Sequence, residues 1–199
     1  MIHVQKGVYT VNEKMTELKS FYSFWATGSG HGTDRAIVAG LLGLAVDDAK
    51  IPHSFELADE AGMKFSFDHV ELVDAHPNTV KLNLTGVNGS VLEVVAASIG
   101  GGRIRVCEID GLPANFEGDY PTLIVRNIDQ PGHVMEVTAM LGHKGVNIAT
   151  LQLFRQSRGG QAAMVIECDQ EVPSESIKWL SRQEGIVKVT YLSQAQRED

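Results

Sequence analysis

Apolar and polar residues alternate along several short stretches in the first half of the chain, as is typical of β-strands buried on one face. The pattern predicts strands over residues 18–25, 80–85, 91–98 and 103–109, and helices over residues 34–46 and 54–61. An Asn88-Gly89 pair between the second and third strands suits a tight hairpin turn. We therefore expect an α+β fold in which helices pack on a mainly antiparallel sheet.

The second half has a clearer pattern, in which alternating and helical stretches follow each other in the order βαββαβ. The predicted elements are 122–128, 131–144, 147–156, 161–167, 174–183 and 186–192. Pro131 suits the first turn of the first helix, Gly145 suits its left-handed cap, and Gly185 suits the end of the second helix. This order predicts a ferredoxin-like sandwich.

Turn-forming residues gather between positions 108 and 120, and this change in composition predicts a linker. We therefore expect two domains, the first over residues 1–117 and the second over residues 118–199.

Charge narrows the classes of partner. The 199 residues include 17 Lys and Arg against 25 Asp and Glu, a formal net charge of −8. No basic run is longer than two residues, which argues against nucleic acid. The longest apolar stretch, residues 36–46, is shorter than the about 20 residues of a membrane span and predicts a buried helix. The first residues lack the apolar core of a signal peptide, so we expect a cytoplasmic protein with no membrane partner.

The chain has only two cysteines, Cys107 and Cys168, each in an apolar segment typical of a strand. This placement predicts reduced, buried thiols rather than a disulfide. Two thiols are too few for a four-iron cluster, so such a cofactor would have to come from another chain. The histidine and cysteine spacings also disfavour a zinc site, and no G-x-S-x-G turn indicates a serine hydrolase.

The most unusual stretch is Gly28-Ser29-Gly30-His31-Gly32-Thr33-Asp34, at the start of the first predicted helix. Its glycines leave the helix amides open to an anion such as a carboxylate, Thr33 or Asp34 can cap the helix, and His31 can face the ligand. The alternative is a tight strand-to-helix turn with an exposed histidine.

The second half also carries a family pattern. The run Asp129-Gln130-Pro131-Gly132, preceded by Asn127 and followed by Gly145-Val146-Asn147-Ile148-Ala149, closely resembles the ACT domain. This amino-acid-sensing module usually pairs edge to edge with a second copy, and the resemblance covers residues 120–192.

For the serine-sensing members, the resemblance implies that Asn127, Asp129 and Asn147 hold the effector and that Gly132 lets the backbone approach it. Asn147 matches the family pattern, whereas Asn127 and Asp129 replace a histidine and an asparagine. The alternative is a dimerisation or docking platform without a ligand.

Two further runs, His76-Pro77-Asn78-Thr79 and Ser98-Ile99-Gly100-Gly101-Gly102, follow the glycine-histidine loop along the chain. The three runs in this order closely resemble the β subunit of the iron–sulfur-dependent L-serine dehydratases, from about residue 20 to the C-terminus. This family deaminates L-serine to pyruvate and ammonia, with a [4Fe-4S] cluster on a partner α subunit acting on the serine hydroxyl. The S-S-S-H-T run that such chains usually carry upstream of the aromatic strand does not occur here.

The resemblance implies a role for several residues of the first half. It makes His31, Thr33 and Asp34 the candidate catalytic residues, and it places Gly30, Gly32, His76, Asn78 and Thr79 in the substrate cleft. His76 can instead be a turn residue whose ring bonds to the backbone, and the three glycines at 100–102 can form a hairpin turn or bulge.

Three functions follow from these patterns. The first is a lyase subunit that needs an α subunit, acts on L-serine and forms homodimers through its ACT half. The second is a regulatory module like the paired intervening and ACT domains of some phosphoglycerate dehydrogenases, which sense serine without chemistry. The third is a free-standing ACT-type scaffold that binds no ligand.

Overall fold

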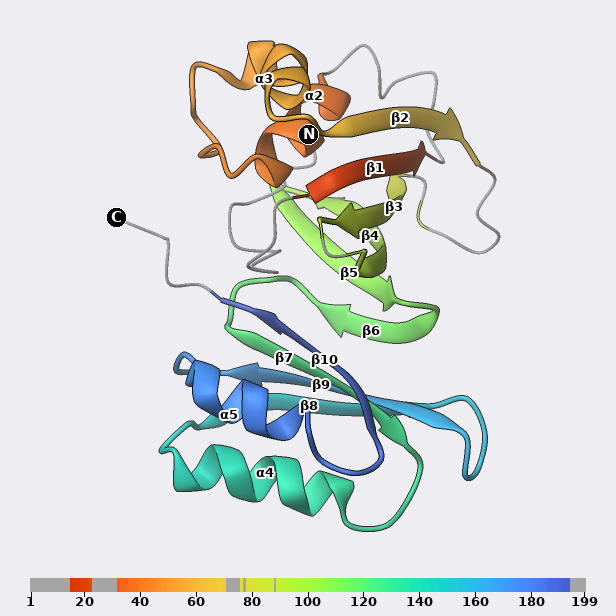
Figure 1. The fold of residues 1–199 in the computed structure, drawn as a ribbon, viewed down its shortest axis with the longest axis vertical. Coiled ribbons are helices and arrows are strands. Elements are labelled where there is room, and N and C mark those ends of the chain that lie inside the picture. Colours follow the sequence, from red (N-terminus) through yellow and green to blue (C-terminus); the bar gives the residue numbers. More distant parts are fainter. Residues whose placement is uncertain (1–14, 23–31, 71–75, 77, 88, 194–199) are drawn as a thin grey trace. The chain divides into compact units, whose positions relative to one another are not determined.

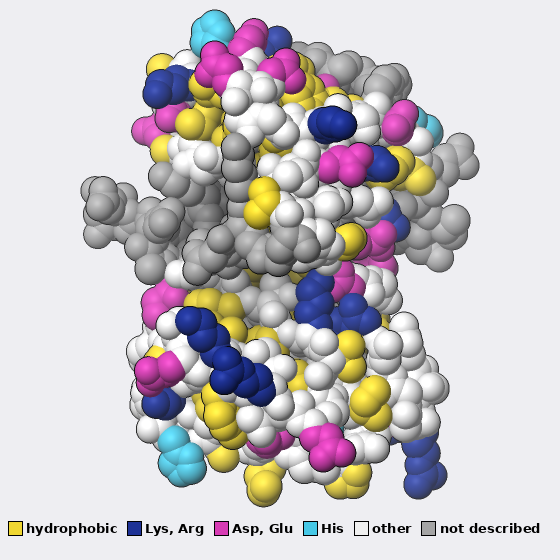
Figure 2. Space-filling view, viewed as in Figure 1, with side chains coloured by type: hydrophobic (Ala, Val, Ile, Leu, Met, Phe, Trp, Pro, Cys, Tyr) yellow, Lys and Arg dark blue, Asp and Glu magenta, His cyan; other side chains and the backbone are white. Residues whose placement is uncertain are grey.

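The computed structural model describes residues 15–22, 32–70, 76, 78–87 and 89–193. Contacts divide the chain into two compact units, which meet in the sequence between Gly111 and Leu112. Acidic and basic side chains are spread over both units on the face shown in Figure 2. None of the helices in the described part of the chain is long and apolar enough to span a membrane.

The first unit is built on a mixed sheet with the strand order β2-β1-β3-β4-β5 (Figure 1). The strands are β1 (Met15–Tyr22), β2 (Lys64–His69), β3 (Thr79–Gly86), β4 (Val91–Gly100) and β5 (Arg103–Ile109). β1 and β2 are parallel, and the other pairs are antiparallel. The helical elements are α2 (Thr33–Leu41), the 3-10 turn η2 (Ile51–His53) and α3 (Ser54–Glu60). The prediction of an α+β fold with a mainly antiparallel sheet is confirmed.

Two elements of this unit differ from the sequence prediction. The apolar run over 36–46 is not one helix, because α2 ends at Leu41 and Gly43 turns the chain with a φ of +80°. Val46, expected in the buried helix, is 48% exposed. β2, in which Phe65 and Phe67 alternate with polar residues, was not predicted from the sequence.

The second unit contains the predicted βαββαβ order. It runs through β7 (Thr122–Ile128), α4 (His133–His143), β8 (Ile148–Arg155), β9 (Gln161–Cys168), α5 (Ser174–Leu180) and β10 (Ile186–Leu192). The strand order is β10-β7-β9-β8 with antiparallel pairing throughout, and Figure 1 shows both helices on the same side of the sheet. Their core includes Leu123 and Val125 from β7, Val137 and Leu141 from α4, and Leu180 from α5.

A further strand, β6 (Leu112–Phe116), begins this unit and lies within the predicted linker. The linker prediction is wrong for these residues. Leu112, Ala114 and Phe116 are buried, and Pro113 and Asn115 between them are exposed. Pro113 and Asn115 therefore occupy the solvent face of an alternating strand.

Two predicted helix ends in the second unit also shift. Pro131 precedes the N-cap Gly132 and so lies outside the first turn of α4. Gly185 lies beyond Ser181, the residue that caps α5, and turns the chain into β10 with a φ of +77°. The prediction for Gly145, which has a φ of +69° directly after α4, is confirmed.

The two thiols have different surroundings. Both are free, and Cys168 is buried as predicted, with a pKa raised to about 11 by burial. Cys107 is exposed, which contradicts the prediction of a buried thiol. On β5 the buried positions are Ile104 and Val106, so Cys107 faces solvent on the other side of the strand.

Candidate functional site

The turn at 76–79 and the run at 98–102 meet at one end of the first unit's sheet, where β1 also ends. Tyr22, the last residue of β1, pairs with Val80 of β3, which pairs in turn with Ala96 of β4. Asn78, just before β3, accepts a hydrogen bond through its carbonyl from the Ser98 amide at 2.9 Å. The strand that leads to the glycine-histidine loop, the turn at 76–79 and the glycines after β4 therefore share this sheet end.

The helix α2 begins at Thr33, after β1 has ended at Tyr22 in the sequence. Gly32 is the N-cap in a left-handed conformation, with a φ of +71°. No side chain caps the helix in the described part of the chain, so the prediction that Thr33 or Asp34 caps it is wrong. Thr33 is buried and Asp34 lies in the first turn. The predicted site residues Gly30 and His31 lie outside the described residues.

Asp34 carries a feature that the sequence did not indicate. Its Oδ1 is buried and has no hydrogen-bond partner among the described residues. The carboxylate also lies beside the buried Tyr22 hydroxyl, whose pKa is raised first by burial and further by the charge of Asp34 and a hydrogen bond to its side chain, while a hydrogen bond with the Ser20 side chain opposes the shift. A buried carboxylate oxygen without a donor can accept a hydrogen bond from a ligand.

The His76 turn has a defined local geometry. The His76 Nδ1 accepts a hydrogen bond from the Asn78 amide at 3.2 Å, and the Thr79 hydroxyl donates to the His76 carbonyl at 2.6 Å. His76 and Asn78 are exposed, whereas Thr79 is buried. The ring thus makes the backbone contact of a turn residue.

The glycines at 100–102 form the β4–β5 turn, with φ angles of +88°, +62° and +75°.

In the second unit, the predicted effector residues before α4 already have partners. Asp129 Oδ2 accepts hydrogen bonds from Arg155 Nη1 at 3.2 Å and from the Gly159 amide at 3.1 Å. Asn127 is buried, and its Nδ2 donates to the Ile128 carbonyl at 2.7 Å. The Asn127 Oδ1 is buried without a hydrogen-bond partner in the described part of the chain.

Asn147 lies at the other end of α4. Its Nδ2 donates to Asp169 Oδ2 at 2.6 Å, and its amide donates to Gln170 Oε1 at 2.7 Å. The 11 residues of α4 extend over about 16 Å. Within one copy of the chain, Asn147 and the pair before α4 therefore do not form a common pocket.

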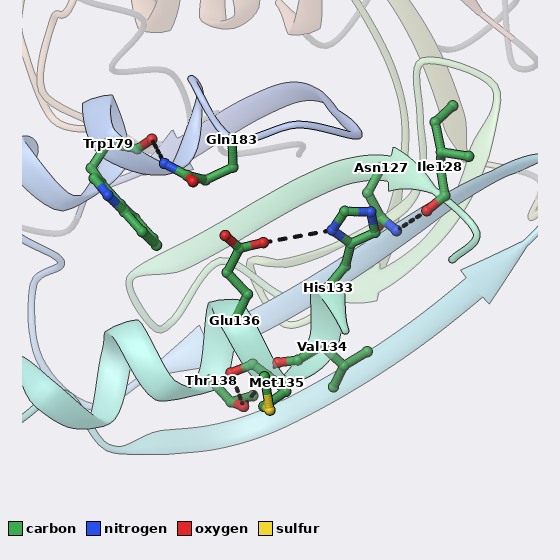
Figure 3. Close-up of polar contacts among 9 residues, drawn as sticks. All are labelled: Asn127, Ile128, His133, Val134, Met135, Glu136, Thr138, Trp179 and Gln183. Carbon is green, nitrogen blue, oxygen red and sulfur yellow. Dashed lines mark hydrogen bonds and ion pairs between the residues drawn. The ribbon is translucent and has the colours of Figure 1, made fainter. Parts of the chain in front are cut away.

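A cavity of about 830 Å³ lies between α4 and α5. Its lining includes Met135, Glu136 and Ala139 from α4, with Ser176 and Trp179 from α5. Figure 3 shows Trp179 extending from α5 and Glu136 extending from α4. The cavity depends on how the two helices pack, so it could not be predicted from the sequence pattern.

His133, at the start of α4, is 9% exposed and also lines the cavity. Its Nδ1 lies 3.6 Å from Glu136 Oε2 (Figure 3). The other side of the ring faces Gly185, where an added Cβ would lie 2.5 Å from Nε2.

The cysteines do not fit a four-iron cluster. Cys107 is exposed on β5 in the first unit, and Cys168 is buried on β9 in the second. Among the residues that the structure describes, no three His, Cys, Asp or Glu side chains lie close enough to bind a metal ion.

No family model matches the chain. It is 34% identical over 177 residues to the L-serine dehydratase β chain of Peptoniphilus asaccharolyticus, a match that covers 88% of this chain and 79% of that relative. The probable L-serine dehydratase β chain of Bacillus subtilis (strain 168) is 34% identical over 175 residues, 87% of this chain and 79% of the relative. The chain belongs to the L-serine dehydratase β-chain family.

A second group of relatives is named for a different activity. The chain is 29% identical over 159 residues to D-3-phosphoglycerate dehydrogenase of Bacillus subtilis (strain 168). That match covers 78% of this chain and 30% of the relative. The likeness is thus to one part of a longer protein.

Proposed function

We propose that this chain is the β subunit of an iron–sulfur L-serine dehydratase, which converts L-serine to pyruvate and ammonia together with an α subunit. The contact between the turn at 76–79 and the run at 98–102, at the sheet end where β1 also ends, carries the proposal, and the naming of the β-chain relatives supports it. We assign the [4Fe-4S] cluster to the α subunit, because the thiols of this chain lie in separate units.

In this proposal, the start of α2 binds the substrate. Its uncapped amides suit the carboxylate of L-serine, and the buried Asp34 Oδ1 accepts a hydrogen bond from the substrate. His31 positions the substrate or moves a proton, since an imidazole titrates near neutral pH. Thr33 is buried, and we assign it a positioning role. Loss of the α proton and of hydroxide gives an aminoacrylate, which takes up water and releases pyruvate and ammonia.

The rest of the proposed cleft is formed by backbone. Gly32, the N-cap, leaves the helix start open, and we assign Gly30 to the same cleft. The turn formed by His76, Asn78 and Thr79 lies at the sheet end where β1 ends. The His76 ring is held by the Asn78 amide, so we assign it to the wall of the cleft rather than to proton transfer.

The test is to co-purify the chain with its α subunit and to measure pyruvate formed from L-serine. His31→Ala and Asp34→Asn should each lower the rate by about 10²-fold. His53→Ala, at an exposed position of η2, is the matched control and should keep the wild-type rate. A complex that forms no pyruvate, or a His31→Ala variant at full rate, would contradict the proposal.

We also propose that the second unit senses L-serine as a homodimer. β8 is an edge strand of its sheet, and it exposes Leu151 by 38% and Leu153 by 51%. Antiparallel pairing of two β8 strands would place the start of one opposite the end of the other. Asn147 of one copy would then approach Arg155 and Asp129 of its partner, which brings the effector residues together.

The alternative function is a serine-sensing regulatory module without catalysis. The likeness to part of D-3-phosphoglycerate dehydrogenase favours it. One experiment distinguishes the two functions. A regulatory module would bind L-serine but would yield no pyruvate when mixed with the α subunit.

A further inference from the structure

The cavity between α4 and α5 shares one residue, Gly132, with the predicted effector site. The proposed catalytic residues and the side chains predicted to hold the effector, Asn127, Asp129 and Asn147, do not line it. Its volume, about 830 Å³, lies within the range of about 300 to 1,000 Å³ that is typical of small-molecule sites. It is therefore large enough for a ligand of its own.

The walls of the cavity are mainly apolar. Met135, Ala139 and Met140 line it from α4, and Trp179 lines it from α5. Met135 is 71% exposed and Trp179 is 45% exposed, so two large apolar side chains are accessible from solvent. A ligand with an apolar body would remove this surface from water.

One end of the cavity suits an anion. Pro131, Gly132 and His133, around the start of α4, belong to its lining. Within the described residues no side chain caps this helix, which has 11 residues. The amides of its first turn, together with the helix dipole, favour a carboxylate at this position.

An independent observation comes from the opposite helix. Ser176 of α5 is 3% exposed, and its Oγ is buried without a hydrogen-bond partner among the described residues. Buried hydroxyls are nearly always hydrogen-bonded. Because Ser176 lines the same cavity, a polar group of a bound molecule would satisfy it.

The charged side chains of the cavity favour an ammonium group as well. Lys144 Nζ and Glu175 Oε1 are 2.9 Å apart, so these two opposite charges already form an ion pair with each other. Glu136 Oε2 faces His133 Nδ1 at 3.6 Å, which is longer than a hydrogen bond. The Glu136 carboxylate, extending from α4 in Figure 3, is therefore available to a cation.

We infer that this cavity binds a free α-amino acid with a branched or aromatic side chain. Its carboxylate lies at the first turn of α4, and its ammonium group lies between Glu136 and Ser176. Its side chain packs against Met135, Ala139 and Trp179. The hydroxymethyl group of L-serine is too small and too polar to cover this apolar surface, so we infer a ligand other than L-serine here.

The chain has two tryptophans, Trp25 and Trp179, so a Trp25→Phe variant of the full chain reports on the cavity alone through its fluorescence. L-Leucine should change the Trp179 emission in a saturable way. L-Serine, 3-methylbutan-1-amine, which lacks the carboxylate, and 4-methylpentanoic acid, which lacks the ammonium group, should bind at least about tenfold more weakly. Equal binding of either analogue would overturn the assignment of a zwitterion.

Single-residue variants test whether the ligand binds in this cavity. Ala139 is exposed, so Ala139→Phe fills the cavity without entering the core and should abolish the response. Glu136→Gln should weaken binding by about tenfold or more, and Glu184→Gln, an exposed residue outside the cavity, should change nothing. Melting temperatures near wild type would establish that the variants fold. Absence of a saturable response to L-leucine and L-phenylalanine at millimolar concentrations, or a response that survives Ala139→Phe, would overturn the inference.

Discussion

Gly185 is the position at which one added methyl group should do the most damage to the second unit. Its φ of +77° is unfavourable for any residue with a Cβ, and an added Cβ would lie 2.5 Å from His133 Nε2. The backbone strain costs about 1 to 2 kcal/mol. Displacing the buried His133 ring costs about 1 to 3 kcal/mol more. Gly185→Ala should therefore lower the free energy of unfolding by about 2 to 5 kcal/mol.

Gly145→Ala provides the matched control. Gly145 has a φ of +69° in the same unit, but no described atom lies within 4 Å of its added Cβ. This variant should lose only the about 1 to 2 kcal/mol of backbone strain. Urea unfolding followed by Trp179 fluorescence in the Trp25→Phe background measures both losses within the second unit.

The contact with His133 can be isolated further by a double-mutant cycle. In a His133→Ala background, the additional loss from Gly185→Ala should fall to that of Gly145→Ala. Equal losses for the two glycine variants in the wild-type background, or an unchanged loss after removal of the ring, would refute the reasoning.

Three other predictions concern ligands and thiols. Asn147→Ala should weaken L-serine binding to the chain by about five- to 150-fold, from the loss of about 1 to 3 kcal/mol of charge-assisted hydrogen bonding. Calorimetric titration measures this, with Asn115→Ala on β6 as the control, and equal affinity in both variants would remove Asn147 from the site. An aromatic disulfide reagent at about pH 8 should react with the exposed Cys107 in the folded protein, although burial also raises the pKa of this thiol. Cys168, buried and with a pKa raised to about 11, should react only after unfolding. Cys107→Ser should remove the reaction of the folded protein. The chain purified anaerobically without its α subunit should contain no iron, and stoichiometric iron and sulfide in metal analysis would contradict the assignment of the cluster to the partner.

The sequence predicted the second unit more accurately than the first. β7 and β10 have the predicted bounds, because turn residues flank their apolar runs on both sides. The strand β6 was missed because Pro113 and Asn115 read as turn residues, although their side chains simply face solvent. The prediction extended the first helix to residue 46, beyond its observed end at Leu41, because an apolar run does not show where Gly43 turns the chain.

The site was less predictable because its contacts join distant positions. Arg155 binds Asp129 from 26 residues away, and no local pattern around either residue indicates this pairing. The cavity between α4 and α5 likewise depends on which faces of two helices meet. Two of the three runs do lie together, since the Ser98 amide at the start of the S-I-G-G-G run donates to the Asn78 carbonyl. The place of the first run stays a prediction.

The bonds of Asp129 have a consequence for how the second unit transmits a signal. Its side chain holds Arg155 and the Gly159 amide, and its own amide donates to the Gly160 carbonyl at 2.8 Å. The loop that leads into α4 is thereby fastened to the end of the outermost strand and to the turn that follows. In the homodimer proposed above, an effector that moves this loop would also move the exposed edge of β8. Effector binding and dimerisation through β8 would then be coupled, and each would change the equilibrium constant of the other by the same factor.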